Sequence, residues 1–213
     1  MKTSTVGIRK EGYPFLFLIA FSSFTFSLIG CWQVAIFLLV ILWICMHFFR
    51  DPERICPNKN NIVVSPADGK IIKIENINSP FTGEQCIYIS IFMNLFDVHV
   101  NRMPITAEIK ETHYYPGKFF NASLDKASKY NERCVYIIEG DEGKFAMVQI
   151  AGLIAQRIVS YVDIGDTLKK GERFGMIKFG SRVDLYIPKN FEPDVAIGEK
   201  VFADQSIIAK LIK

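Results

Sequence analysis

The chain has 213 residues, of which half are hydrophobic and 22% are charged, with 14 Gly and 9 Pro. Its mean hydropathy of +0.20 is high for a soluble domain, and the composition excludes collagen-like, disordered and disulfide-scaffold classes. The net charge of +3 comes from residues 1–50, because residues 51–213 hold 21 basic and 21 acidic side chains. A balanced domain lacks the electrostatic footprint of nucleic-acid binding, so we expect no nucleic-acid partner.

Residues 14–49 form one apolar stretch of 36 residues without Asp, Glu, Lys or Arg. A single spanning helix needs about 20 residues, so two short helices that turn at Gly30 fit the length better. Basic residues precede and follow the stretch, and a hairpin keeps both groups on the cytoplasmic side. We predict that residues 1–50 are a membrane anchor, as two spans or a hairpin inserted into one leaflet. The chain is then expected at the cell (inner) membrane, with the rest on the cytoplasmic side.

From Asp51 onward, short apolar runs rich in Ile, Val, Tyr and Phe alternate with Gly, Pro, Asn and Asp. This texture is typical of strands connected by turns. Residues 139–144 (EGDEGK) predict a hairpin turn, and residues 121–131 predict a short helix or a long loop. We expect residues 51–213 to form a mainly β domain with few short helices.

A weak internal repeat lies near the C-terminus. Residues 162–178 can be laid on residues 195–211 with an offset of 33, so that Gly165 falls on Gly198. The shared pattern resembles the small β-sandwich of lipoyl and biotinyl carrier domains, and residues 65–71 (SPADGKI) have a similar pattern. This resemblance predicts a barrel-sandwich architecture with hammerhead-like turns.

The five cysteines are an odd number without a CxxC motif, and the three histidines are scattered. Zinc sites need clustered ligands. We therefore predict reduced cysteines in a reducing compartment and no metal.

The Gly180–Ser181 pair lies between two strand-like runs, RFGMIK and VDLYIP. Its ordinary interpretation is a strand bend with a solvated serine. A serine hydroxyl can also attack the carbonyl carbon of the residue before it and move the acyl group from nitrogen to oxygen, which strain at the peptide makes less unfavourable. The resulting ester can eliminate to dehydroalanine, which hydrolyses to a pyruvoyl group.

Other segments carry polar residues with two interpretations each. If residues 92–104 (FMNLFDVHVNRMP) are extended, Asp97, His99 and Asn101 share one face, and a surface strand explains the same spacing. Asp68 lies in an Asp–Gly pair, for which a turn is the default. Arg157 lies among apolar residues, where a buried arginine needs an anionic partner.

Together these segments resemble the phosphatidylserine decarboxylase proenzymes of the short bacterial and archaeal type. The resemblance covers most of residues 60–209, in order. The matching segments are SPADGKI, MNLFDVHVNRMP, YPGKFFNASLDKASKYNER, GLIAQRIV, DIGDTLKKGERFGMIKFGSRVDLYIP and IGEKVFADQSIIA. The apolar N-terminal segment also fits a family that works on a membrane lipid.

The resemblance implies serinolysis at Gly180–Ser181, which gives a β chain of residues 1–180 and an α chain of residues 181–213. The two chains would stay together as a heterodimer, or as a dimer of these. Ser181 would become a covalent pyruvoyl group and no other cofactor is needed. Phosphatidylserine would form a Schiff base on that group, which accepts the electron pair left by CO₂. The product is phosphatidylethanolamine, and an ether-linked archaeal serine phospholipid is an alternative substrate.

The site residues of the family carry over in part. Asp68 matches an acid that acts with His and Ser in self-cleavage in the longer members, and we expect it to be the base or an orienting residue. His99 matches the first of their two histidines and is expected to donate a proton to the decarboxylated carbon. Arg102 stands where they have the second histidine, and Phe-Gly-Ser-Arg replaces their Leu-Gly-Ser-Thr. Arg102 and Arg157 are candidates for binding the lipid phosphate or carboxylate, although a structural ion pair explains either equally well.

A non-enzymatic alternative is a membrane-anchored adaptor with a lipoyl-like domain. It accounts for the anchor and for the repeat. However, it predicts a long heptad hairpin, which the sequence lacks, and it leaves the DVHVNRMP and FGSR segments unexplained. The enzyme is the favoured prediction.

Overall fold

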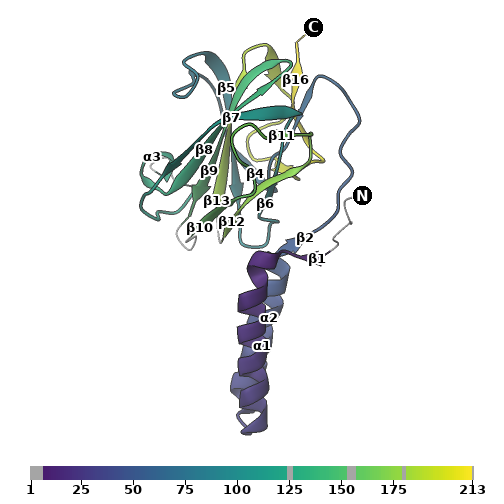
Figure 1. The fold of residues 1–213 in the computed structure, drawn as a ribbon, viewed down its shortest axis with the longest axis vertical. Coiled ribbons are helices and arrows are strands. Elements are labelled where there is room, and N and C mark those ends of the chain that lie inside the picture. The colour runs from purple at the N-terminus through teal and green to yellow at the C-terminus, as the bar shows by residue number, and fades with distance from the viewer. Residues whose placement is uncertain (1–6, 124–126, 153–156, 179–180, 213) are drawn as a thin grey trace. The chain divides into compact units, whose positions relative to one another are not determined.

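The computed structural model describes residues 7–123, 127–152, 157–178 and 181–212. The chain divides into two compact units, Met1–Glu53 and Arg54–Lys213. The sequence analysis placed the corresponding boundary between residues 50 and 51. Figure 1 shows that helices dominate the first unit and strands the second.

The first unit is a pair of apolar helices, α1 (Tyr13–Leu28) and α2 (Trp32–Phe48), preceded by the short 3-10 helix η1 (Lys10–Gly12). Gly30 lies between them with a φ of +79°, a left-handed conformation that glycine adopts without steric cost. The Ser23 hydroxyl donates to the Ala35 carbonyl at 3.0 Å and so joins the two helices. The short strands β1 (Gly7–Ile8) and β2 (Arg50–Asp51) pair at their base. The helices thus lie where the sequence predicts a hairpin.

Large apolar side chains of both helices are exposed, including Phe17 at 74% and Trp32 at 66%. The helical stretch Lys10–Leu28 has the length and hydropathy needed to cross a membrane, whereas Trp32–Phe48 is apolar but shorter. An exposed apolar surface of this kind is unfavourable in water and marks a membrane or protein contact. Both observations are consistent with membrane association.

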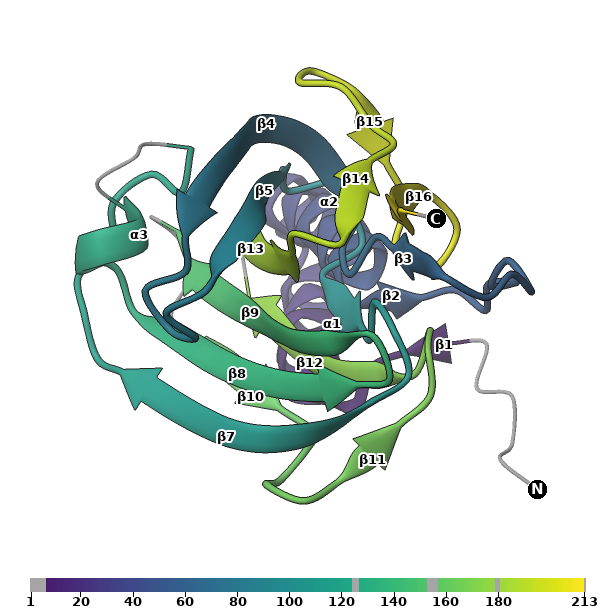
Figure 2. The same cartoon turned by 90° about the horizontal axis from the view of Figure 1, so that it is seen from above.

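The second unit is built mainly from strands, as predicted. Its largest sheet is antiparallel, in the order β11-β7-β8-β9-β13-β5-β4-β15. Figure 2 shows this sheet curving from β4 through β13 to β7. Its strands are β4 (Gly69–Asn78), β5 (Gln85–Met93), β7 (Ala107–Tyr115), β8 (Arg133–Gly140), β9 (Gly143–Ala151), β11 (Thr167–Leu168), β13 (Ser181–Pro188) and β15 (Lys200–Val201).

Two smaller sheets accompany it in the described part of the chain, in the orders β10-β12-β6 and β14-β16-β3. Their strands are β3 (Ile62–Val64), β6 (Val100–Arg102), β10 (Arg157–Ser160), β12 (Arg173–Lys178), β14 (Phe191–Pro193) and β16 (Ile207–Leu211). The short helix α3 (Ala127–Tyr130) falls inside the segment 121–131 where a helix or loop is predicted. The predicted turn within 139–144 joins β8 to β9.

Strand β13 is buried on both faces, although its sequence, SRVDLYIP, includes the charged residues Arg182 and Asp184. Val183, Leu185 and Ile187 belong to the main core cluster, whereas Tyr186 belongs to a second cluster on the other face. Because side chains alternate along a strand, Ser181 lies on the main-core face.

The sequence repeat corresponds to a repeated backbone structure. Gly165 N donates to Ile109 O at 2.8 Å, and 33 residues later Gly198 N donates to Ile71 O at 2.8 Å. Both glycines have a φ of +93°. We call residues 65–71 with 196–206 the first copy, and residues 103–109 with 163–172 the second copy.

Candidate active site

Ser181 opens the central strand β13, where it pairs with Met93 of β5 on one side and Ala151 of β9 on the other. The residue is fully buried. Its hydroxyl donates to the Met93 sulfur at 3.2 Å. A thioether is a weak acceptor and cannot take up the proton, so a base for Ser181 has to come from another residue. Gly180, the predicted partner in cleavage, lies outside the described residues.

A buried polar chain leads away from Met93. Asn101 donates to the Met93 sulfur at 3.7 Å, Gln149 donates to Asn101 at 2.7 Å, and Tyr136 donates to Gln149 at 3.0 Å. Burial raises the pKa of Tyr136, so its hydroxyl stays protonated and able to donate. These uncharged groups fix the side chain that receives the Ser181 hydroxyl.

His99 lies immediately before β6 and is fully buried. Its Nδ1 is 2.9 Å from the carbonyl oxygen of Asp97. A carbonyl only accepts hydrogen bonds, so Nδ1 carries a proton, and in the neutral form of the ring the lone pair is on Nε2. Asp97 in turn accepts from the Asn94 backbone N–H at 2.9 Å, which shapes the loop that carries the histidine.

The backbone places His99 beside the strand that precedes Ser181 in the chain. Ile177 N donates to His99 O at 3.3 Å, so the histidine lies beside the end of β12. Strand β12 ends at Lys178 and β13 begins at Ser181. Residues 179 and 180 therefore join the strand next to the histidine to the strand that begins with the serine.

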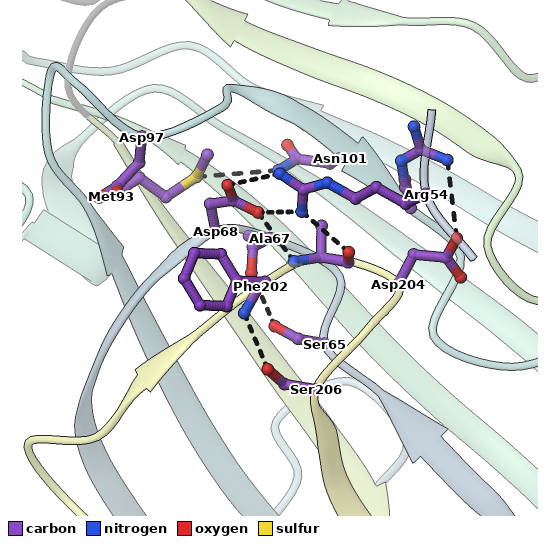
Figure 3. A network of polar contacts seen from close by, with 12 residues as sticks. Arg54, Ser65, Ala67, Asp68, Met93, Asp97, Asn101, Phe202, Asp204 and Ser206 are labelled. Atoms are coloured by element: carbon purple, nitrogen blue, oxygen red, sulfur yellow. Dashed lines mark hydrogen bonds and ion pairs between the residues drawn. The ribbon is translucent and has the colours of Figure 1, made fainter. Parts of the chain in front are cut away.

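Asp68 is buried in a two-pronged ion pair with Arg54 (Figure 3). Arg54 Nη2 donates to Asp68 Oδ2 at 2.7 Å, and Nη1 donates to Oδ1. The Ala203 backbone N–H also donates to Oδ1, at 2.8 Å. These donors suit a carboxylate that orients its surroundings.

The two arginines predicted to bind substrate have different environments. Arg102 is buried, 3.1 Å from Gly171 O and 3.7 Å from Asp204 Oδ2, so it makes the kind of internal ion pair that the sequence left open. Arg157 was expected among apolar residues in the interior. That expectation is wrong, because Arg157 is exposed at the start of β10, opposite Lys178 in the ladder. It lies at the strand end, where its guanidinium stays in water.

Comparison with known proteins bears on this arrangement. The family model for phosphatidylserine decarboxylase matches residues 41–209. The chain belongs to the phosphatidylserine decarboxylase family. It is 54% identical over 211 residues to the phosphatidylserine decarboxylase proenzyme of Nitratidesulfovibrio vulgaris, covering 99% of this chain and 97% of that protein. It is 52% identical over 210 residues to the corresponding proenzyme of Oleidesulfovibrio alaskensis (98% and 96%) and 46% identical over 206 residues to that of Polynucleobacter asymbioticus (96% and 95%).

The resemblance deduced from the sequence segments is thereby confirmed, and so is the prediction that the chain is an enzyme of the decarboxylase class. The mainly β fold is confirmed as well. The roles assigned to individual residues stay predictions.

Sequence analysis did not identify three residues that contact, or directly follow, the predicted site residues. Arg54 was counted with the basic flank of the membrane segment, although it contacts Asp68. Met93 ends the apolar run CIYISIFM, and nothing in the sequence distinguishes it from the other residues of that strand. Arg182 was noted only as a departure from the longer members' motif, yet it is one of the largest fully buried side chains. A charged residue inside an apolar strand, as in SRVDLYIP, is the signal that could have revealed it.

Proposed function

We propose that the chain cleaves itself between Gly180 and Ser181 and then decarboxylates phosphatidylserine to phosphatidylethanolamine. The observation that carries the proposal is the position of Ser181. Ser181 is fully buried and begins a central strand. Two residues separate it from the end of β12, where the Ile177 N–H donates to the His99 carbonyl. The similar proteins of the two species compared first are named phosphatidylserine decarboxylase proenzymes.

Complete burial of Ser181 favours chemistry on the chain itself. A hydroxyl with no exposed surface cannot meet an external substrate in this state, whereas the carbonyl of Gly180 is covalently adjacent. In the proposed step, His99 Nε2 takes the hydroxyl proton and Ser181 Oγ attacks that carbonyl. The acyl group moves from nitrogen to oxygen, and elimination of the ester releases the carboxylate of residue 180 and leaves dehydroalanine. Hydrolysis then expels ammonia and leaves a pyruvoyl group.

Asp68 acts as an orienting residue in this proposal. Its two oxygens already receive hydrogen bonds from Arg54 and Ala203. A carboxylate engaged in this way is better suited to fix the position of neighbouring groups than to remove a proton from Ser181.

The surroundings of Ser181 fit a pyruvoyl group in its place. The Ser181 hydroxyl contacts the uncharged Met93 sulfur, and ladders on both sides hold the strand. Such a group supplies a carbonyl that binds a primary amine and withdraws electrons from it. The residues around position 181 would hold the substrate and keep water out. His99 would deliver a proton to the substrate carbon that has lost CO₂.

The two cleavage products would stay together. The α chain would begin with β13, which pairs along its length with β5 and over most of it with β9, and both of these strands belong to residues 1–180. Losing one covalent bond leaves these ladders and the core around Val183 and Leu185 in place.

Substrate contacts follow from exposure and charge. Arg157 is exposed beside Lys178, two residues before the cleavage site, and is the better candidate for the lipid phosphate. Arg102 is engaged internally with Asp204 and Gly171. The exposed apolar helices support attachment to a membrane. The basic residues that flank them favour the inner membrane, with the β domain on the cytoplasmic side.

The test is decarboxylation by the purified full-length chain of carboxyl-labelled phosphatidylserine in vesicles. We expect release of labelled CO₂ by the wild type and none by Ser181→Ala, whereas Ser27→Ala, which alters an exposed serine of α1, keeps the activity. An ether-linked serine phospholipid in parallel vesicles tests the alternative substrate. No release from either lipid would contradict the proposal.

A further inference from the structure

Arg182 follows Ser181 directly, and its side chain is buried on the opposite face of β13 with an exposed fraction of 2%. Its guanidinium makes a two-pronged contact with Asp184, with Nε to Oδ1 and Nη2 to Oδ2 both at 2.7 Å. Nη2 also donates to the Tyr88 hydroxyl at 2.9 Å, and Nη1 donates to the Ala122 carbonyl at 3.3 Å. Four hydrogen bonds to other described residues therefore hold the residue after the cleavage site.

The partners of Arg182 are themselves fixed. Asp184 accepts from the Tyr88 hydroxyl at 2.9 Å and from the Ser90 hydroxyl at 2.7 Å. Burial and the nearby Asp184 carboxylate raise the pKa of Tyr88, so it stays protonated and keeps donating. We call Arg182, Asp184, Tyr88 and Ser90 the Arg182 cluster.

Stability alone is a weak reason for such a cluster. Removing two charges from water is costly, and apolar side chains of similar volume often replace buried ion pairs without loss of stability. The second core cluster, on the same face of β13 as Arg182, consists of apolar and aromatic side chains. Unlike apolar packing, the two-pronged ion pair fixes the direction of the Arg182 side chain and so the position of the backbone at residue 182.

That direction matters at this position because cleavage would make Ser181 the end of a chain. Conversion of Ser181 would also remove its backbone nitrogen as ammonia, and with it any hydrogen bond which that nitrogen makes. Strand ends fray when their backbone bonds are lost. The guanidinium anchored at the next residue does not depend on those bonds.

We propose that Arg182 is a positioning residue that holds residue 181 in register before, during and after self-cleavage. This inference rests on the proposed function. Arg182 does so through Asp184 within its own strand, through Tyr88 in β5, and through Ala122, which belongs to the segment between β7 and β8. None of these hydrogen bonds involves Ser181 itself.

The test compares Arg182→Lys and the double variant Arg182→Met/Asp184→Leu with the wild type. Lysine keeps the positive charge but cannot make the two-pronged contact of the guanidinium. The double variant replaces the ion pair with apolar side chains of similar size. The measurements are the first-order rate of precursor cleavage by intact mass, thermal unfolding, and kcat and KM of the cleaved fraction. We expect both variants to cleave about 10- to 100-fold more slowly, which is the cost of misplacing a reacting group by about 1 Å. We also expect kcat to fall with KM unchanged, even where the double variant unfolds at the wild-type temperature.

The outcomes separate positioning from simple stability. A double variant that folds and cleaves at the wild-type rate overturns the inference. If the double variant does not fold, Tyr88→Phe decides instead, because it removes one hydroxyl from the cluster and leaves the ion pair. Slower cleavage of Tyr88→Phe supports the inference and wild-type cleavage overturns it. Tyr186→Phe, on the same face of β13 but four residues further on, is the matched control and should cleave normally. A wild-type chain that stays uncut would instead contradict the proposed function itself.

Discussion

The two copies of the internal repeat share a backbone but differ in charge. In the first copy, Asp204 N donates to Ser65 O at 2.9 Å, and in the second copy Gly171 N donates to Met103 O at the same distance. Short strands pair alike in both, with Val201 opposite Gly69 and Leu168 opposite Ala107. The fold of the turn is therefore independent of most of its side chains.

The difference lies in the residue that caps the turn. Asp68 of the first copy accepts from the Ala203 backbone N–H at 2.8 Å, and Thr106 of the second copy accepts from Lys170 N–H at 3.1 Å. A neutral hydroxyl thus does the same structural work as the carboxylate. The buried charge of Asp68, matched by Arg54, needs a reason outside the turn. Figure 3 draws both the Asp68–Arg54 ion pair and the contact between Asn101 and the Met93 sulfur. The same sulfur accepts the hydrogen bond from the Ser181 hydroxyl.

The largest expected effect comes from making the first copy resemble the second. Asp68→Thr keeps a cap for Ala203 but leaves Arg54 without its carboxylate, which should cost about 3–5 kcal/mol of unfolding free energy. Adding Arg54→Met should recover much of that stability. We expect the double variant to fold and yet cleave itself about 100-fold more slowly, because loss of an orienting carboxylate lets a reacting group move by about 1 Å. Thermal unfolding and intact mass measure the two effects, and a folded double variant with normal cleavage would show that the charge has no part in processing.

Matched glycine substitutions test the shared backbone. Gly165 and Gly198 both have a φ of +93°, and a Cβ on either would meet no atom closer than 3.8 Å. Alanine in a left-handed conformation costs about 1–2 kcal/mol. Gly165→Ala and Gly198→Ala should therefore lower the free energy of unfolding by similar amounts in urea titrations. A difference of several kcal/mol between them would break the equivalence of the copies.

The sequence predicted the repeated turns but not their partners. Gly165 and Gly198 are recognisable because glycine is tied to left-handed backbone. The segments 65–71 and 103–109 share few residues, and their equivalence comes from main-chain hydrogen bonds that many side chains permit. The ion pair of Asp68 was missed because its partner, Arg54, had an adequate explanation as a membrane flank. Arg157 was misjudged because its apolar neighbours in sequence do not show which strand end reaches solvent.

A smaller effect is expected in the second copy. Thr106→Val removes the hydroxyl that caps the Lys170 N–H but keeps the shape of the side chain. The loss of one hydrogen bond to a partly solvated group should cost about 1 kcal/mol. Self-cleavage should stay at the wild-type rate, since this copy carries no charge at the position. Slow cleavage in a stable Thr106→Val chain would contradict the claim that only the first copy affects self-cleavage.

The smallest effect concerns Asp204, which stands where the second copy has Gly171. Burial, and then hydrogen bonding to and repulsion by Asp204, raise the pKa of the nearby Cys56 thiol to about 12. Asp204→Asn removes the two Asp204 contributions and leaves burial, so the pKa should fall part of the way toward its ordinary value. Alkylation of Cys56 at mildly alkaline pH, followed by peptide mapping, should then speed up about several-fold. An unchanged rate would show that burial alone controls the thiol.

The central claim is that Ser181 becomes the end of a new chain. Intact mass spectrometry of the purified wild type beside Ser181→Ala tests it most directly. The account predicts two wild-type chains, of about 20 and 4 kDa, with the smaller one lighter by one ammonia than a chain beginning in serine, and an uncut Ser181→Ala chain. A folded wild-type chain that stays in one piece, with Ser181 intact, would contradict it.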